Sequence, residues 1–207
     1  MKKMLHIIGL TAAVLSMGMA SVSAPVLPGS AHEALYSIAF HQDQAIAVGA
    51  AGELLESADA GKTWKAVTPA PTVLALLGVG LSQGHAIIVG QQGLVLVMNS
   101  DGHWQSVDSG TKQRLLGVTV NNDGLAVAVG AFGTLLRSLD GGKTWISIAP
   151  DWAPYTETGE RPHFYAAAVN DSGKITVAGE FGLILISDDG GKSWKTVHKG
   201  DQTSPSL

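Results

Sequence analysis

Short apolar runs alternate with turn-forming residues along the chain after position 35, and no stretch there has helical periodicity. One unit shows the pattern clearly, with apolar runs at 115–120, 126–130, 134–138 and 144–148. An Asn-Asp-Gly turn at 122–124 separates the first two runs, and a G-x-x-G turn at 130–133 separates the next two. We therefore expect four short strands in this unit and almost no helix.

This four-strand pattern occurs four times, over 35–69, 76–108, 115–149 and 164–199. One tryptophan per unit follows the last at spacings of 40, 41 and 49 residues. A repeat of about 40 residues with strand-like runs is typical of a propeller blade. The sequence predicts an all-β fold, a β-propeller with four four-stranded blades.

An octet with the pattern S-x-D-x-G-K-[ST]-W lies between the third and fourth expected strands. It occurs at 57–64, 138–145 and 187–194, and a worn copy about one residue shorter lies at 99–104. Asp in a tight turn accepts backbone N–H bonds, Gly supplies a positive φ, and Trp can bury its ring against its own blade. We expect structural roles for Asp59, Trp64, Asp101, Trp104, Asp140, Trp145, Asp189 and Trp194.

Metal and cofactor sites are not indicated. A calcium loop needs several oxygen ligands at short alternating spacing, which the octets lack, and the histidines have no zinc-ligand spacing. We therefore expect no metal, no cofactor and no catalytic residue.

The first strand of each unit has one bulky and one small face. In the first unit Tyr36, Ile38 and Phe40 alternate with Ser37 and Ala39, and the other units follow the same rule. The first strand of a blade lies nearest the propeller axis, where space is tightest. The small faces favour a compact ring of four blades in one chain, and two chains forming a larger ring are the alternative.

The N-terminus has the features of a secretory signal peptide. Lys2 and Lys3 precede an apolar run at 4–20, and small residues precede Pro25. We expect cleavage after Ala24, although an uncleaved membrane anchor is the alternative. The predicted domains are a signal peptide (1–24), an irregular arm (25–34), one propeller domain (35–199) and a polar tail (200–207). The mature protein would be periplasmic or secreted, without a transmembrane segment.

Charge and cysteine content narrow the function classes. Loss of two lysines with the signal peptide changes the net charge from −4 to −6, which argues against nucleic-acid binding. The chain has no cysteine, so an exported domain would depend on packing alone.

The G-x-x-G turns and the links between blades should share one side of the disc, opposite the octets. The longest link, 150–163, contains two aromatic residues and three prolines that the repeat does not require, so it could bind a partner or plug the propeller end. Arg114 and Arg161 precede the first strands of the third and fourth units, whereas Arg137 should lie on a solvated edge. The candidate partner face consists of Arg114, Phe132, Trp152, Tyr155, Arg161, His163, Glu180 and Phe181.

The octet resembles the Asp-box, or bacterial neuraminidase repeat. The wider unit G-x-x-G-x-hydrophobic-x-x-S-x-D-G-G-K-T-W, matched at 129–145 and 178–194, resembles the photosystem II stability/assembly factor family and its non-photosynthetic bacterial relatives. The resemblance implies a β-propeller that acts as a binding or assembly platform beside a membrane complex. We expect a protein partner from an envelope or membrane complex, and a monomer or homodimer.

Asp-boxes also occur in sialidases, so a glycan-binding or sialidase-like glycoside hydrolase module is the alternative. Sialidases use an arginine triad, a Tyr–Glu pair and an Asp acid. The mature chain has three arginines, and Tyr36, Tyr155 and Tyr165 have no obvious Glu partner, with Glu33, Glu160 and Glu180 left open. A non-catalytic protein is therefore the preferred hypothesis.

Overall fold

The computed structural model describes residues 34–200, so the predicted signal peptide, almost all of the arm at 25–34 and the tail beyond residue 200 lie outside the described residues. Within that range the chain is all-β, apart from short 3-10 turns at Ala50–Gly52, Gln91–Gly93 and Glu180–Gly182. No helix in the described range has the length and apolar content needed to cross a membrane.

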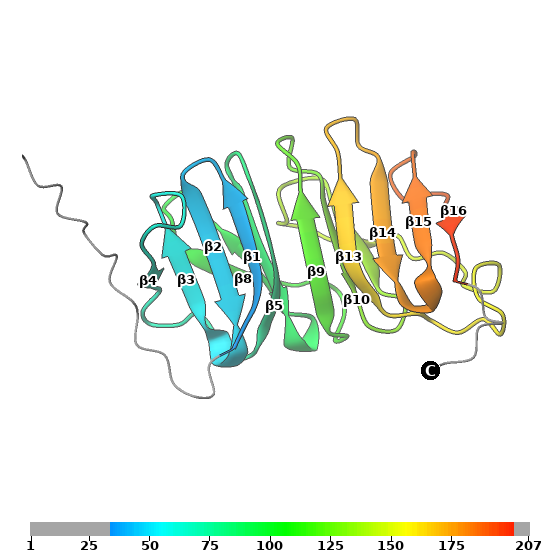
Figure 1. Ribbon diagram of the computed structural model, residues 1–207, viewed down its shortest axis with the longest axis horizontal. Helices are drawn as coiled ribbons and strands as arrows, with labels where there is room; N and C mark the ends of the chain where they lie inside the picture. Colours follow the sequence, from blue (N-terminus) through cyan, green and yellow to red (C-terminus); the bar gives the residue numbers. More distant parts are fainter. Residues whose placement is uncertain (1–33, 201–207) are drawn as a thin grey trace, which may run out of the picture.

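Four antiparallel, four-stranded sheets follow one another in chain order, as Figure 1 shows. Each sheet is a simple meander in which neighbouring strands are consecutive in sequence, which is the form of a propeller blade. The prediction of four four-stranded blades is confirmed. The blades are β1 (Leu35–His41), β2 (Gln44–Gly49), β3 (Leu54–Ser57) and β4 (Lys65–Ala66); β5 (Leu76–Ser82), β6 (His85–Gly90), β7 (Val95–Met98) and β8 (Trp104–Val107); β9 (Leu115–Val120), β10 (Ala126–Gly130), β11 (Leu135–Ser138) and β12 (Ile146–Ser147); β13 (Phe164–Val169), β14 (Ile175–Gly179), β15 (Ile184–Ser187) and β16 (Lys195–His198).

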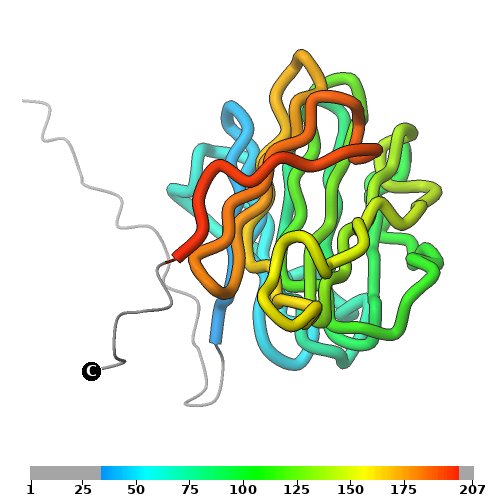
Figure 2. Tube along the Cα trace, turned by 90° about the vertical axis from the view of Figure 1, so that its right-hand side faces the viewer, coloured from blue at the N-terminus to red at the C-terminus, as the bar shows by residue number. Residues whose placement is uncertain are grey.

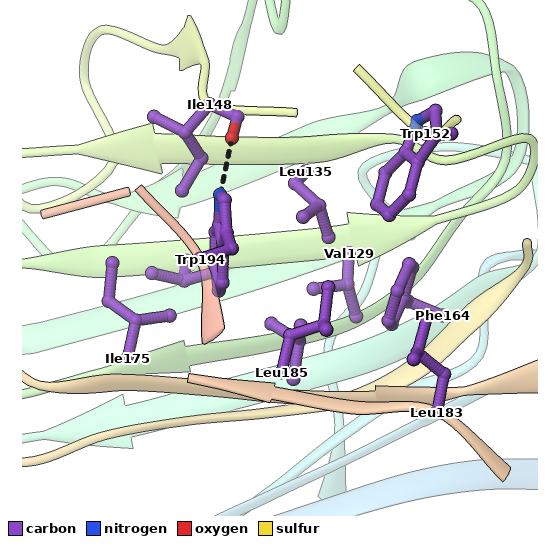
Figure 3. Close-up of a cluster of buried hydrophobic side chains, with 11 residues drawn as sticks. Val129, Leu135, Ile148, Trp152, Phe164, Ile175, Leu183, Leu185 and Trp194 are labelled. Atoms are coloured by element: carbon purple, nitrogen blue, oxygen red, sulfur yellow. Dashed lines mark hydrogen bonds between the residues drawn. The ribbon is translucent and has the colours of Figure 1, made fainter. Parts of the chain in front are cut away.

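The hydrophobic core consists of three layers, one between each pair of consecutive blades. Figure 3 shows the layer between the third and fourth blades, where Leu135 and Val129 face Leu185 and Phe164. Successive residues of the second and third strands point to opposite faces, so each blade contributes to the layer before it and the layer after it. A blade is therefore buried fully only when it has a neighbour on both faces.

The small faces of the first strands allow close approach of the blades. A Cβ on Gly78 would lie 2.9 Å from the Cα of Gly117, and a Cβ on Gly117 would lie 2.7 Å from the carbonyl oxygen of Tyr165. The small faces of the second and third blades thus receive the first strand of the next blade at backbone distance. The prediction that small residues serve crowding near the axis is consistent with these distances.

A bulge near the start of each first strand changes the expected alternation. The register shifts between Leu35 and Ser37 in β1, and at the equivalent place in β5 and β13. Consequently Leu76 of β5, and not Leu77, is fully buried against the preceding blade, and Phe164 of β13 takes the same place. The bulky face therefore begins one residue earlier than the sequence pattern indicated.

The preference for a ring closed within one chain is wrong for the described residues. The close contacts between first strands are those of β1 with β5, β5 with β9 and β9 with β13. The first and fourth blades lie at opposite ends of an open arc (Figure 1). Small faces permit close contact between neighbours, but they do not set the rotation from one blade to the next.

The three complete octets form the same hydrogen-bonded turn. In the third blade Asp140 accepts hydrogen bonds from the Ser138 hydroxyl at 2.7 Å and from the Thr144 backbone N–H and hydroxyl at 2.9 and 2.7 Å. Desolvation alone would raise the pKa of Asp140, but hydrogen bonds led by those from Ser138 and Thr144 lower it to about 2. The carboxylate is therefore ionised at neutral pH and holds the turn closed.

The worn copy uses a different residue for the same purpose. Asn99 accepts hydrogen bonds from the backbone N–H groups of Asp101 and His103, at 3.0 and 2.8 Å. The structural role expected for Asp101 therefore belongs to Asn99, because a turn one residue shorter places the Asn side chain over the backbone donors.

Two of the four octet tryptophans, Trp104 and Trp194, and Arg137 connect blades, contrary to expectation. Trp194 donates its indole N–H to the carbonyl oxygen of Ile148 at 3.0 Å, a bond visible in Figure 3, and Trp104 donates to Glu56 at 2.9 Å. The guanidinium of Arg137 is half-buried and donates to the carbonyl oxygen of Gly190. These side chains lie between blades because the octet turn leans onto the preceding blade.

Replacement of Gly117 by Val tests the close approach of β9 and β13. The added side chain must displace backbone, so we expect Gly117→Val to lower the free energy of unfolding by about 1–3 kcal/mol. Chemical denaturation followed by tryptophan fluorescence measures this loss. Gln105→Val places the same residue on the exposed strand β8 and should change stability by less than about 0.5 kcal/mol. Equal stability of the two variants would contradict the close contact.

Candidate binding site

The two sides of the arc differ as the blade topology requires. Each G-x-x-G turn donates a backbone hydrogen bond to the residue just before its own first strand, as from Ala131 to Arg114 at 2.9 Å and from Glu180 to His163 at 2.9 Å. The octet turns instead bond to the first hairpin of a blade, as from Gly141 to Gly124 at 2.9 Å. The links between blades and the G-x-x-G turns therefore lie on one side, opposite the octets.

The long link 150–163 folds onto the G-x-x-G turn of the third blade (yellow in Figure 2). Trp152 is 5% exposed and lies under this turn, so a Cβ on Gly133 would be 2.3 Å from its indole nitrogen. Pro162 accepts the backbone N–H of Gly133 at 2.8 Å, and the Tyr155 hydroxyl donates to Trp194 at 3.0 Å. The two aromatic residues of this link thus extend the core, and its polar residues remain outside.

A cavity of about 550 Å³ lies beside this link, on the side of the G-x-x-G turns. Exposed Phe132 and Arg161 line it, and Trp152 forms part of its wall. The link between the second and third blades contributes as well, through Thr111 and Gln113. Residues from three segments of the chain therefore converge on one concave surface.

Two further residues predicted for the partner face, His163 and Glu180, are hydrogen-bonded to each other at the rim of the cavity. Glu180 accepts hydrogen bonds from the His163 backbone N–H at 2.7 Å and from the Tyr165 hydroxyl at 3.3 Å, and its carboxylate is 3.0 Å from His163 Nδ1. The imidazole of His163 in turn packs edge-on against Phe132, with 4.9 Å between ring centroids. Glu180 thus holds the aromatic rim of the cavity in place.

The eight residues predicted for the partner face therefore do not all lie at the cavity. Phe132, Trp152 and Arg161 line the cavity, and His163 and Glu180 support its rim. Arg114 and Phe181 are exposed but do not line the cavity, and Tyr155 packs inward.

Thr111, Gln113 and Tyr165 were not among the residues predicted for the partner face. Thr111 and Gln113 belong to a short polar link that carries no pattern distinct from other loops. Tyr165 meets Glu180 because the bulge in β13 turns its side chain away from the core. The other first strands share this bulge, so the comparison of the four repeats was the signal that could have indicated the position of Tyr165.

The strained backbone conformation at the rim of the cavity is common to the G-x-x-G turns of all four blades. Phe132 and Phe181 have φ values of 53° and 57°, but Ala51 and Gln92 occupy the same place in the other G-x-x-G turns with 51° and 58°. The left-handed conformation is therefore a property of the turn, and it presents the side chain at that position to solvent.

A second cavity, of about 630 Å³, lies on the octet side between the first and second blades. Asp59, Ser57 and Thr63 line it, but their polar atoms already bond to one another within the octet. The shortened turn of the second blade forms its other wall through Asn99 and Gly102.

The four blades and the Asp-box turns define a β-propeller repeat protein whose concave site lies on the side of the links. The model of the photosynthesis system II assembly factor YCF48 family matches residues 97–205, and the chain belongs to this family. A comparison with curated protein sequences gave no match.

Solved structures agree with this fold. The chain superposes on YCF48 from Cyanidioschyzon merolae with a TM-score of 0.63 and 19% identity, covering 85% of this chain and 59% of that one. For YCF48 bound to D1 peptide the TM-score is 0.60 and the identity 18%, over 79% and 54% of the two chains. The GH74 xyloglucanase from Xanthomonas campestris gives 0.56 and 22%, over 72% and 26%. Such identities establish the fold alone, and the chain spans little more than half the length of the YCF48 structures.

Substitution of Glu180 tests the charge at the rim. The pKa of Tyr165 is raised above 10.0, first by desolvation and then by the negative charge and hydrogen bond of Glu180. Glu180→Gln removes the charge, so the pKa of Tyr165 should fall part of the way back while desolvation persists. Ultraviolet titration of the tyrosines, with Tyr165→Phe to assign the transition, measures this. An unchanged pKa would contradict the pairing of the two side chains.

Proposed function

We propose that this chain is a non-catalytic binding protein that holds an extended peptide segment of a protein partner in the cavity beside the link 150–163. Membership of an assembly-factor family supports a binding role, and one solved YCF48 structure contains a D1 peptide. The observation that carries the proposal for this chain is the cavity itself, built by links that the blade repeat leaves free to vary.

The walls of the cavity suit a peptide with an acidic side chain or a free carboxylate. The exposed ring of Phe132 offers an apolar surface, and the guanidinium of Arg161 offers paired donors for a carboxylate. Gln113 and Thr111 add polar atoms that can bond to a peptide backbone. The site thus combines an aromatic anchor with an arginine, which are residue types that dominate binding energy at interfaces.

We place the partner in an envelope or membrane complex and this chain in the periplasm or outside the cell. The support is the signal-peptide pattern of residues 1–24, which lies outside the described residues, together with the assembly-factor family. Signal-peptide processing can be checked by intact mass of the exported protein.

The hydrolase alternative receives less support. The hydrogen bond between Tyr165 and Glu180 brings together the kind of pair that the sequence left open. However, the raised pKa of Tyr165 opposes formation of the phenolate that a nucleophilic tyrosine needs. The superpositions on GH74 enzymes concern the fold, and active sites are particular to their own residues.

Binding measurements on matched variants test the site. An array of peptides tiled over exposed segments of envelope membrane proteins supplies a ligand, and fluorescence anisotropy gives its affinity. Phe132→Ala and Arg161→Ala should each weaken binding about tenfold, because each removes a wall of the cavity. Phe181→Ala removes an aromatic ring from the equivalent turn of the fourth blade, outside the cavity, and should change affinity less than about twofold.

Equal losses in Phe132→Ala and Phe181→Ala would contradict assignment of the site to the cavity. Amidation of a C-terminal carboxylate, or replacement of an acidic side chain by its amide, should reproduce the effect of Arg161→Ala if that guanidinium binds the carboxylate. Hydrolysis of a glycoside substrate by the wild type, lost in Glu180→Gln, would instead favour the hydrolase.

A further inference from the structure

The two ends of the arc expose the two halves of one blade-to-blade interface. At the start, the bulky face of the first blade is uncovered, and Leu35, Ile38 and Phe40 are each more than half exposed. The counterparts of Leu35 at the heads of the other first strands, Leu76, Leu115 and Phe164, are 0% exposed. The first blade therefore carries a formed interface surface without its usual cover among the described residues.

We call this surface the bulky end, defined as Leu35, Ile38, Phe40, Leu55 and Trp64. Leu55 is half-buried, whereas the residues at its register position in the other blades, Leu96, Leu136 and Leu185, are 5% exposed or less. The same residue types thus occupy the same positions in all four blades, and only the first blade leaves them open.

The opposite face of the fourth blade is the receiving end, defined as Ala166, Ala168, Thr176, Ala178, Ile184 and Ile186. Ala166 and Ala168 are exposed, although Gly117, the counterpart of Ala166, lies directly under the next blade. Alanine at both positions keeps the small face that first-strand contact requires. All six side chains are uncharged, so covering this face would bury no charge belonging to them.

Hydrogen bonding shows which internal interface the two ends would reproduce. In the contact between the first and second blades, Trp104 of the second blade donates to Glu56 of the first. In the contact between the third and fourth blades, Arg137 of the third blade donates to the octet of the fourth. In the contact between the second and third blades, the second blade has the apolar Val97 at this position, and Trp145 of the third blade donates instead to Gly142 of its own octet.

The two free ends of the arc match the contact between the second and third blades. Trp64 donates to Gly61 of its own octet at 3.1 Å, as Trp145 does to Gly142. The receiving end has Ile186 at the register position of Val97, so it presents an apolar side chain to a tryptophan that has no unpaired donor. The two ends are complementary in shape, polarity and hydrogen bonding.

From this match we propose that two copies of the chain associate head to tail, the bulky end of each on the receiving end of the other, to close a ring of eight blades. A contact between two different surfaces closes only when the rotation per subunit fits a ring. Eight blades lie within the range of known propellers.

Sedimentation velocity on the full chain, with two complementary variants, tests the proposal. The wild type should have twice the mass of one chain. Ile38→Glu at the bulky end and Ala168→Glu at the receiving end should each give a monomer, because each buries a charge in both contacts of the ring. Mixing the two variants should restore a dimer, because one of its two contacts then contains only wild-type surfaces.

Ile146→Glu is the matched control. Ile146 is 54% exposed, as Ile38 is, but lies on the outer strand β12, so this variant should remain a dimer. Circular dichroism of each variant establishes that its blades are folded. A monomeric wild type would overturn the proposal, as would open assemblies larger than two chains. A dimer broken by Ile38→Glu but unaffected by Ala168→Glu would also overturn it, since that result indicates two bulky ends in contact.

Discussion

The contact between the small face of one first strand and the bulky face of the next determines the rest of this structure. Gly78 and Gly117 allow neighbouring strands to meet at backbone distance, and the larger residues of the second and third strands then fill the layer between the sheets. Because the contact is directional, every blade has a receiving face and an inserting face. An arc of four blades consequently has two different ends, and the exposed apolar side chains at its start follow from the same geometry.

The octets stabilise this arrangement and leave the other side free for binding. Asp140 and its counterparts hold the turn between the last two strands through hydrogen bonds within the turn, while Trp104 and Trp194 donate hydrogen bonds to the preceding blade. With one side of the arc committed to these turns, variation in the links falls on the opposite side. The cavity at Phe132 and Arg161 lies there because the link 150–163 folds against a G-x-x-G turn.

Much of the fold could be predicted from periodicity, because strand length and turn residues are local properties. The strands expected at 115–120 and 126–130 agree with β9 and β10. Ring closure could not be predicted, since it depends on a small rotation between blades that no single residue determines. The inward positions of Trp152 and Tyr155 were also ambiguous, because an aromatic residue in a loop serves equally well as a contact or as core. Sequence located the side and the link of the candidate site, and the structure located the concave surface.

The claim that each blade needs cover on both faces can be tested directly by native-state hydrogen exchange. In the wild type at concentrations where the ring is closed, the amides that β1 donates to β2 should exchange about as slowly as those between β9 and β10. Dilution to the monomer should accelerate exchange in β1 while β9 keeps its protection, because β9 is covered within the chain. Fast exchange in β1 at every concentration, or slow exchange that dilution does not change, would contradict the account.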